Sequence, residues 1–352
     1  MERTKKAEPL SLQMKRKSLK PVLEEKKEYD GDFGTVISTG STLLDLAISG
    51  GRIRGGGLPG GILVEAFGPS GSGKTVLLSE IAGAVQRQGG DIMFADPEAR
   101  LNKQFASMFG LNLRDEDYSR PDTVTDLFKS INEWEPKTFK KKIINGIFAD
   151  SLAALSTKLE MESKDGDKMG MRRAKEFSEE LRKSARVLVK KNLLMVCSNQ
   201  VRVNMDAGPY GQKYITPGGE AIGFYSSLRL RFTKPEKIKD KVKVVGKEVT
   251  RVIGVEVLID VFKSSIWKPY HTASLYILFD YGIDDIRANL QYIKDFTKNT
   301  KYYVQDHELD VSLEKSIKMV EKYEWEQELK EQTISLWEEI ESKFEQERKP
   351  KR

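Results

Sequence analysis

The sequence predicts an α/β protein with a mostly parallel central sheet that antiparallel strands extend. Four apolar runs predict the parallel strands, because enough chain for a crossover helix separates them: "ILVEAF", "DIMFAD", "IINGIFAD" and "NLLMVCS". Three later runs are β-branched or alternate apolar with polar residues, which predicts antiparallel extension of the same sheet: "SLRLRFTK", "VIGVEVLIDVF" and "ASLYILF". A glycine-rich loop, "GPSGSGKT", directly follows the first run and precedes an amphipathic helical pattern.

Length and composition limit the class of protein. The chain has 352 residues, 39% hydrophobic and 32% charged, which is typical of a soluble globular protein of two or three domains. Its apolar runs are shorter than the ~20 residues that cross a bilayer, and its N-terminus lacks the apolar centre of a secretion signal. We therefore expect a cytoplasmic protein without a membrane partner. One cysteine and two histidines exclude an internal disulfide and argue against a zinc site.

Charge and apolar spacing divide the chain into three predicted parts. Residues 1–34 are rich in Lys and Arg and contain Pro9 and Pro21, which predicts a basic N-terminal arm with a short helix at most. The arm could lie on nucleic acid, on a neighbouring subunit as a polymerisation segment, or in solvent. Residues 35–283 contain the predicted sheet. Residues 284–352 carry helically spaced apolar residues among charges, which predicts a small helical C-terminal domain with a charged tail.

The glycine-rich loop matches the pattern G-x-x-x-x-G-K-[ST] at Gly68, Gly73, Lys74 and Thr75. Glycines allow backbone N–H groups to turn towards phosphates at close range. Lys74 is then expected to reach the β and γ phosphates, and the Thr75 hydroxyl to bind Mg²⁺. Because a predicted strand precedes the loop and a predicted helix follows it, we expect ATP and Mg²⁺ as cofactors.

Polar residues end three further predicted strands. Asp150 closes "IFAD", where a carboxylate that holds Mg²⁺ through water is expected. Glu98 follows "MFAD" and could orient an attacking water, while Gln200 follows "CSN" and could sense the γ phosphate. Since parallel strands present their carboxyl ends at one edge of a sheet, we expect Lys74, Glu98, Asp150 and Gln200 to lie close together.

Two polar segments have the composition of nucleic-acid-binding loops. "MESKDGDKMGMRRAK" sets cations around Met169 and Gly170, and "NMDAGPYGQKYITPGGEAIGFYSS" is a long glycine-rich stretch. Cations neutralise phosphates, and an apolar residue between them can separate the bases of a single strand. We therefore expect these segments to bind single-stranded DNA.

Several blocks together resemble the bacterial RecA strand-exchange recombinases, in the same order along the chain: "VISTGSTLLDLAI", "GGGLPGGILVEAFGPSGSGKT", "DKMGMRR", "SNQVR", "PGGEAIGFYSSLRLRF" and "VVGKEVTRV". The resemblance runs from about Thr35 to Gly282 and more loosely through the C-terminal helices. It implies a RecA-like P-loop ATPase core for the predicted sheet.

The resemblance also implies roles for individual residues. Glu98 would activate water, Gln200 would couple the γ phosphate to the loop behind it, and Lys263 would reach the ATP of a neighbouring subunit. The triphosphate, its metal and adenine would contact Gly68, Pro69, Ser70, Gly71, Ser72, Gly73, Lys74, Thr75, Asn102, Phe105, Asp150 and Phe279, with Thr75 and Asp150 serving the metal. Loops near 160–173 and 201–219 would bind DNA, through Met169, Gly170, Arg172, Arg173, Arg202, Gly218 and Gly219. Phe224 matches a residue at the boundary between protomers.

The chain departs from the family pattern at three places. Ser265 replaces the second lysine of the family's K-x-K pair, and Lys268 is the nearest following cation. Glu220 replaces an amide residue after the Gly-Gly of the second loop. The sequence ends in "ERKPKR", where bacterial members carry an acidic tail.

These observations predict a DNA-dependent ATPase that forms helical filaments on single-stranded DNA, pairs it with homologous duplex DNA and exchanges strands in recombination and repair. One alternative is a RecA-like paralogue that binds ATP and DNA to assist another recombinase. A second alternative is a hexameric helicase or motor with the same core fold. The pair Glu98 and Gln200 favours hydrolysis over a purely structural use of ATP.

Overall fold

A computed structural model describes residues 34–138, 140, 142–157, 160–161, 169–203, 214–217, 220–297 and 299–344. Contacts within the chain divide it into two units, Met1–Gly34 and Thr35–Arg352. Apart from Gly34, the predicted N-terminal arm lies outside the described residues, so the description concerns the second unit.

A ten-stranded sheet forms the centre of this unit, and six of its strands run parallel. In spatial order these strands are β10 (Leu228–Phe232), β3 (Leu63–Gly68), β7 (Leu193–Gln200), β6 (Asn145–Ala149), β4 (Ile92–Ala95) and β5 (Tyr118–Ser119). The four predicted parallel strands, β3, β4, β6 and β7, are thus confirmed. The segment "SLRLRFTK" was predicted to extend the sheet in antiparallel fashion, but it forms β10, which runs parallel to β3 and antiparallel only to β12. Its alternating pattern reflects partial exposure and does not fix the strand direction. Strand β5 was not predicted because only two of its residues pair with β4.

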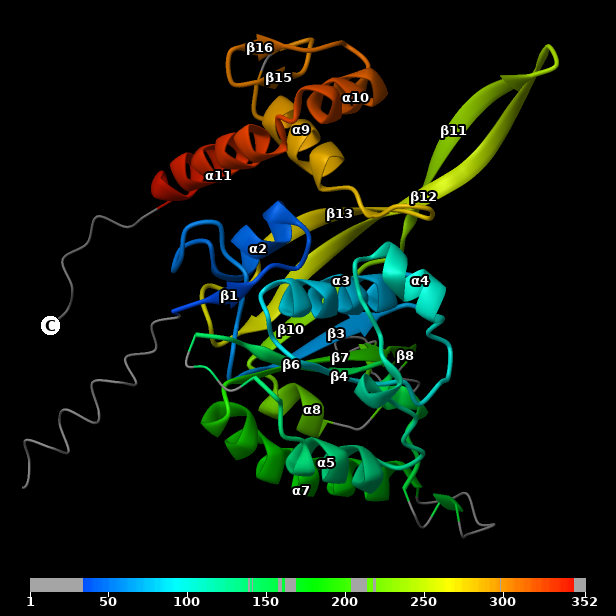
Figure 1. Cartoon of the computed structure of the whole chain (residues 1–352), viewed down its shortest axis with the longest axis vertical. Coiled ribbons are helices and arrows are strands. Elements are labelled where there is room, and N and C mark those ends of the chain that lie inside the picture. The colour runs from blue at the N-terminus through cyan, green and yellow to red at the C-terminus, as the bar shows by residue number, and fades with distance from the viewer. Residues whose placement is uncertain are drawn as a thin grey trace, which may run out of the picture. The chain divides into compact units, whose positions relative to one another are not determined.

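The remaining strands extend the sheet in antiparallel fashion, as predicted: β12 (Lys247–Ser264), β13 (Thr272–Leu278), β14 (Gly282–Ile283) and β11 (Glu236–Val244). Strand β12 pairs with β10, β13 and β11, and its first half forms a hairpin with β11 that extends away from the sheet (Figure 1). The prediction covered only the second half of β12. The hairpin was missed because nearly all of its side chains are exposed, so no buried face marks it.

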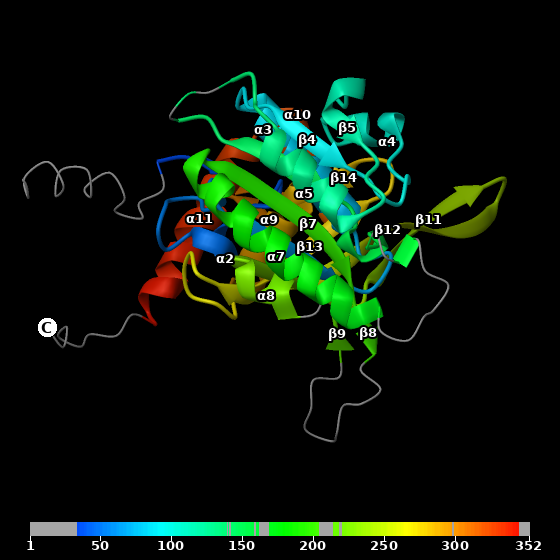
Figure 2. The ribbon, with the colours of Figure 1, turned by 90° about the horizontal axis from the view of Figure 1, so that it is seen from below.

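Helices cover both faces of the parallel strands. Helix α3 (Lys74–Arg87) packs on one face, and α5 (Val124–Glu133), α7 (Met169–Lys190) and α8 (Glu220–Tyr225) lie on the other (Figures 1 and 2). Burial on both faces explains why these strands are continuously apolar. Shorter elements connect them: β1 (Val36–Ile37), β2 (Leu58–Pro59), α4 (Lys103–Met108), β8 (Arg202–Val203), β9 (Tyr214–Ile215), and 3₁₀ turns at Asp115–Asp117 and Leu152–Ala154.

The C-terminal residues form a small subdomain with a core of its own. Its elements are α9 (Asp285–Asp295), β15 (Tyr303–Val304), β16 (His307–Glu308), α10 (Leu313–Tyr323) and α11 (Glu326–Ser342). Helix α11 packs on α2 (Thr42–Ser49) through a cluster that contains Leu46, Ile334 and Trp337. Arg54 adds ion pairs to Glu331, at 3.0 Å, and to Glu338. The two-strand β15–β16 pair was not part of the predicted helical domain.

A buried carboxylate organises the start of α2. Asp45 is 2% exposed and accepts hydrogen bonds from the Thr39 amide at 2.8 Å, the Thr39 hydroxyl at 2.7 Å and the Ser38 hydroxyl at 2.5 Å. Burial raises the pKa of Asp45 from 3.8 to about 6, although these hydrogen bonds act in the opposite direction.

This raised pKa predicts a pH dependence of stability. Because the pKa of Asp45 is higher in the folded state, the folded protein binds the proton more tightly, and this stabilisation is complete below pH ~4 and lost as the pH rises through about 6. The full change is roughly 3 kcal/mol. Urea unfolding measures this effect if the unfolding free energies of wild type and Asp45→Asn are compared at each pH from ~4 to ~7. The difference between the two proteins should change by about this amount across that range. Parallel pH profiles for the two proteins would contradict the assignment.

Candidate nucleotide-binding site

The loop from Gly68 to Thr75 connects the end of β3 to the start of α3. Gly73 caps α3 with φ 87°, a left-handed conformation that favours glycine, and a Cβ at this position would have to displace the end of the Ile277 side chain. The first-turn N–H groups of α3 receive no side-chain cap from Gly73. Free amides at the positive end of a helix suit a phosphate, so this backbone fits a bound triphosphate.

Lys74 lies folded over this loop. Its Nζ donates to the Pro69 carbonyl at 2.6 Å, the Gly68 carbonyl at 3.2 Å and the Ser72 hydroxyl at 3.4 Å. Burial lowers the pKa of Lys74, while the negative charges of Asp150 and Glu98 act in the opposite direction. The ammonium group is thus partly desolvated and surrounded by neutral acceptors that a phosphate oxygen could replace.

Thr75 and Asp150 lie in direct contact at the carboxyl end of β6. Asp150 accepts hydrogen bonds from the hydroxyls of Thr75 and Ser198, and its pKa is raised by burial. Among the described residues, no group of three or more His, Cys, Asp or Glu side chains is arranged to hold a metal ion. Mg²⁺ commonly takes one or two carboxylates together with phosphate oxygens and water. Thr75 and Asp150 therefore fit Mg²⁺ as part of a nucleotide complex.

Glu98 and Gln200 are also brought together. Gln200 Nε2 donates to Glu98 Oε1 at 3.2 Å, and the Ser151 hydroxyl donates to the same oxygen at 2.8 Å. Arg100 Nη1 lies 2.7 Å from Glu98 Oε2. Ser151, Ser198 and Arg100 were not predicted; their only signal is that each stands within two residues of a predicted site residue. The structure thus gathers the four strand-end groups that the parallel sheet was expected to align.

The residues predicted for adenine lie on two neighbouring elements. Asn102 caps α4 by accepting from the Gln104 amide at 2.8 Å, and Phe105 is 36% exposed with its ring edge-to-face on Phe109. Phe109 is the C-cap of α4, and a Cβ on Gly282 would lie 2.8 Å from its ring. The end of α4 therefore lies beside the turn that follows the exposed Phe279. Two exposed phenyl rings on adjacent elements are compatible with a flat ligand.

Lys263 is placed elsewhere. Its Nζ donates to the carbonyls of Gly223 and Phe224, at 2.9 and 3.0 Å, which lie near the end of α8. Phe224 itself is 75% exposed. Lys268 lies over the Trp267 ring at 5.1 Å and 3.9 Å from Glu341. Both cations therefore contact groups outside the loop at 68–75.

The predicted DNA-binding loops differ in part from the structure. Met169, Gly170, Arg172 and Arg173 lie in the first turns of α7 instead of in a loop. Arg172 is exposed, whereas Arg173 forms an ion pair with Glu160 at 3.0 Å. In the second segment, Arg202 belongs to β8, which pairs with β9, and this short hairpin was not predicted. Gly218 and Gly219 lie outside the described residues.

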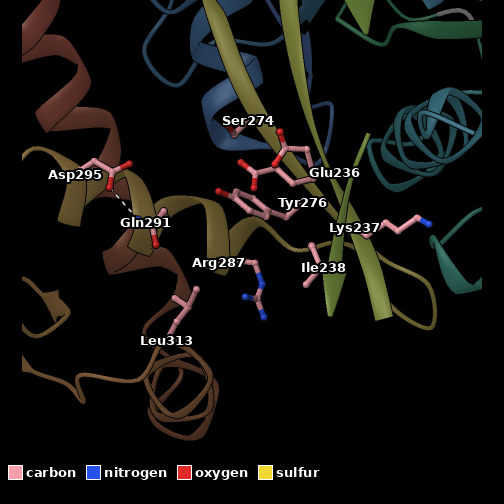
Figure 3. Close-up of a pocket in the computed structure, with 10 residues that line it drawn as sticks. Glu236, Lys237, Ile238, Ser274, Tyr276, Arg287, Gln291, Asp295 and Leu313 are labelled. Atoms are coloured by element: carbon pink, nitrogen blue, oxygen red, sulfur yellow. Dashed lines mark hydrogen bonds between the residues drawn. The ribbon is translucent and has the colours of Figure 1, made fainter. Parts of the chain in front are cut away.

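A separate polar cavity of about 550 Å³ lies between strands β11 to β13 and helices α9 and α10. Figure 3 shows Arg287 and the hydrogen-bonded pair Gln291 and Asp295 on the helical side, and Glu236 and Tyr276 on the strand side. None of the predicted site residues lines it. In the part of the chain that the structure describes, we also find no helix that is both long and apolar enough to cross a membrane.

The contact between Thr75 and Asp150 predicts a metal-dependent effect. In the wild type, Mg²⁺ should strengthen ATP binding, and in Asp150→Asn this enhancement should fall by about 10- to 100-fold because the carboxylate that orients the ion and its water is lost. Titration of a fluorescent ATP analogue with Mg²⁺ or with EDTA measures it. Asp260→Asn, which removes the carboxylate beside Arg231, serves as the control. An Mg²⁺ enhancement in Asp150→Asn equal to that of the wild type would contradict the assignment.

Comparison with known proteins identifies the family of the chain. A family model described as the RecA N-terminal domain matches residues 17–284. "Protein RecA" of Anaplasma marginale (strain Florida) is 35% identical over 261 residues, which are 74% of this chain and 67% of that protein. "Protein RecA" of Thermus thermophilus is 36% identical over 252 residues, 71% of this chain and 69% of that protein. "Protein RecA" of Delftia acidovorans is 34% identical over 248 residues, which are 70% of this chain and 63% of that protein.

A solved structure described as "Crystal structure of the RadB recombinase" has a TM-score of 0.47 and 19% identity, and the similarity covers 70% of this chain and 98% of that one. The curated relatives support the family assignment, because the matched residues cover about two thirds of each relative's length. From the matched residues 17–284 and these relatives, it follows that the chain belongs to the RecA family.

Proposed function

We propose that this protein is an ATP-dependent DNA recombinase that forms filaments on single-stranded DNA and catalyses homologous pairing and strand exchange in recombination and repair. Membership of the RecA family supports ATP binding, ATPase activity and a role in recombination in general. The observation that carries the finer proposal is the hydrogen bond between Gln200 and Glu98, 3.2 Å long, beside the contact of Thr75 with Asp150. A carboxylate that can orient water is thereby linked to an amide that can sense the γ phosphate.

Each residue has a defined task in this proposal. Lys74 exchanges its contacts with the Gly68 and Pro69 carbonyls for phosphate oxygens, because an ion pair is a stronger partner than a neutral carbonyl. Thr75 and Asp150 hold Mg²⁺, which offsets negative charge on the phosphates. Glu98 orients the attacking water and accepts its proton, with Ser151 fixing the carboxylate. Asn102, Phe105 and Phe279 face the adenine.

DNA binding and self-association belong to the same proposal. Arg172, with Met169, Gly170, Arg202, Gly218 and Gly219, is assigned to single-stranded DNA, where backbone contacts suffice because base pairing reads the sequence. Arg173 can join them only by leaving Glu160. Lys263 is assigned to the ATP of a neighbouring subunit and Phe224 to the boundary between subunits. The division at residues 34 and 283, the arm at 1–34 and a cytoplasmic location remain parts of this proposal.

The proposal predicts an ATPase that single-stranded DNA stimulates. We expect at least about a tenfold increase in ATP turnover on adding single-stranded DNA, and a loss of roughly 10²- to 10³-fold in kcat for Glu98→Gln with ATP affinity retained, since the variant removes a general base and keeps the site's shape. Glu236→Gln, an exposed carboxylate of β11, is the matched control and should keep wild-type turnover. Turnover that is indifferent to added single strands would contradict the proposal.

Two further assays distinguish the alternatives. Strand exchange by the purified protein alone supports a recombinase, whereas exchange only in the presence of a second recombinase supports an assisting paralogue. Unwinding of a forked duplex without strand exchange supports a helicase or motor.

A further inference from the structure

A charged side chain lies in the middle of a fully buried strand. Glu65 is 0% exposed and lies in β3, two residues before Phe67 and three before Gly68. A buried carboxylate is strongly unfavourable unless it is paired and hydrogen-bonded. Here Arg229 Nε donates to Oε2 at 2.6 Å and Asn199 Nδ2 donates to Oε1 at 3.0 Å. Glu65 therefore joins side chains of the two strands that flank β3, namely β10 and β7.

On the β7 side, the contact leads to the nucleotide site. Asn199 Oδ1 accepts a hydrogen bond from the backbone N–H of Gln200 at 3.0 Å, and Asn199 Nδ2 also donates to the Pro217 carbonyl at 3.1 Å. Gln200 in turn donates to Glu98. Asn199 is completely buried and cannot replace its partners with water. A displacement of Gln200 that shifts the end of β7 would therefore change the hydrogen bond between Asn199 and Glu65.

On the β10 side, the contact leads to α8. The Arg229 guanidinium lies over the ring of Phe67 at 4.5 Å and that of Phe262 at 5.5 Å, so its position is narrowly defined. A Cβ built on Gly223 would lie 3.0 Å from Arg229 Nη1, which shows how closely α8 approaches this guanidinium. Arg229 is also the register partner of Lys263 across β10 and β12, and Lys263 holds the Gly223 and Phe224 carbonyls.

We propose that Glu65 is a positioning residue that couples the Gln200 end of β7 to α8 and Lys263, through Asn199 on one side and Arg229 on the other. The negative charge of Glu65 offsets the repulsion between the two neighbouring cations, Arg229 and Lys263. A change in the Asn199 contact alters how firmly Arg229 is held, and thereby the position of Lys263 against the end of α8. The inference rests on the proposed use of Gln200 as a sensor of the γ phosphate.

Hydrogen exchange of residues 220–225, measured with and without ATPγS and Mg²⁺, tests the coupling without DNA. In the wild type, nucleotide should change the exchange rate of these amides by at least fivefold. In Glu65→Gln the change should fall to less than twofold, while the affinity for ATPγS stays within about threefold of wild type because Glu65 does not contact the loop at 68–75. A nucleotide response in Glu65→Gln equal to that of wild type would overturn the proposal, as would the lack of any response in the wild type.

Because Glu65→Gln leaves the half-buried Arg229 guanidinium without its counter-ion, the variant could unfold. Arg229→Lys keeps a positive charge beside Glu65 but loses the planar group between the two rings, and should also reduce the response of residues 220–225 to below twofold. Arg231→Lys is the matched control: this arginine lies two residues further along β10, is 51% exposed on its side chain and pairs with Asp260. It should respond as wild type does. Equal responses in Arg229→Lys and Arg231→Lys would overturn the coupling.

A separate measurement, ATP turnover with and without single-stranded DNA, distinguishes failure of the recombinase proposal from failure of the coupling. ATP turnover of the wild type that ignores single-stranded DNA would refute the recombinase, whereas the exchange response of residues 220–225 would still report on Glu65. If DNA stimulates the wild type, Glu65→Gln should lose most of that stimulation in kcat and keep KM for ATP within about threefold, which a general loss of folded protein would not produce.

Discussion

The parallel alignment of β3, β4, β6 and β7 is the constraint on which the candidate site depends. These strands end at the same edge of the sheet. Gln200 is the last residue of β7, Glu98 and Asp150 follow β4 and β6, and Lys74 begins α3 after the loop that follows β3. The helix-capping glycine at residue 73 then places the α3 amides at that edge. A shift of one residue in any of these registers would turn the terminal side chain to the opposite face. The continuous apolar content of the strands, which resists such shifts, is therefore also what keeps the site assembled.

Three carboxylates, two of them buried and one half-buried, show how this protein keeps charge in and beside its core. Asp45 accepts hydrogen bonds from two hydroxyls and a backbone amide, Asp150 accepts from two hydroxyls, and burial raises the pKa of each. Glu65 instead has a guanidinium partner at 2.6 Å. Neutral donors leave a carboxylate able to change its partners, as a metal ligand must, whereas removing one member of a buried ion pair costs about 3–5 kcal/mol. Asp150 is thus suited to exchange ligands, and Glu65 to hold its neighbours in place.

Features that depend on local pattern could be predicted from the sequence, whereas features that depend on long-range pairing could not. Apolar runs and turn residues directly mark the buried strands, the loop at 68–75 and the strand-end positions of Glu98, Asp150 and Gln200. The contact of Gln200 with Glu98 joins residues 102 positions apart and depends on strand register, so no local pattern reveals it. The β11–β12 hairpin lacks a buried face, and the ion pair of Arg173 with Glu160 arises only once α7 has formed. Glu65 did carry a signal, since a lone carboxylate within an apolar run requires a buried partner.

The contacts of Lys263 also bear on how subunits could respond to each other. Ser265, which the resemblance aligns with a second lysine, donates its backbone amide to the Ser227 carbonyl at 2.7 Å, and Lys268 contacts Trp267 and Glu341. Lys263, in contrast, binds two carbonyls near the end of α8. Such a contact is worth only about 0.3–1 kcal/mol, far less than a charge-assisted bond to phosphate in a desolvated site. In the proposed filament, the triphosphate of a neighbouring subunit would therefore draw Lys263 away from Gly223 and Phe224. Arg229 lies beside Lys263 and is bound by Glu65. Under the proposed function, the release of Lys263 would therefore also act on the contacts that reach Gln200, and the nucleotides of two neighbouring subunits would act on one shared set of contacts.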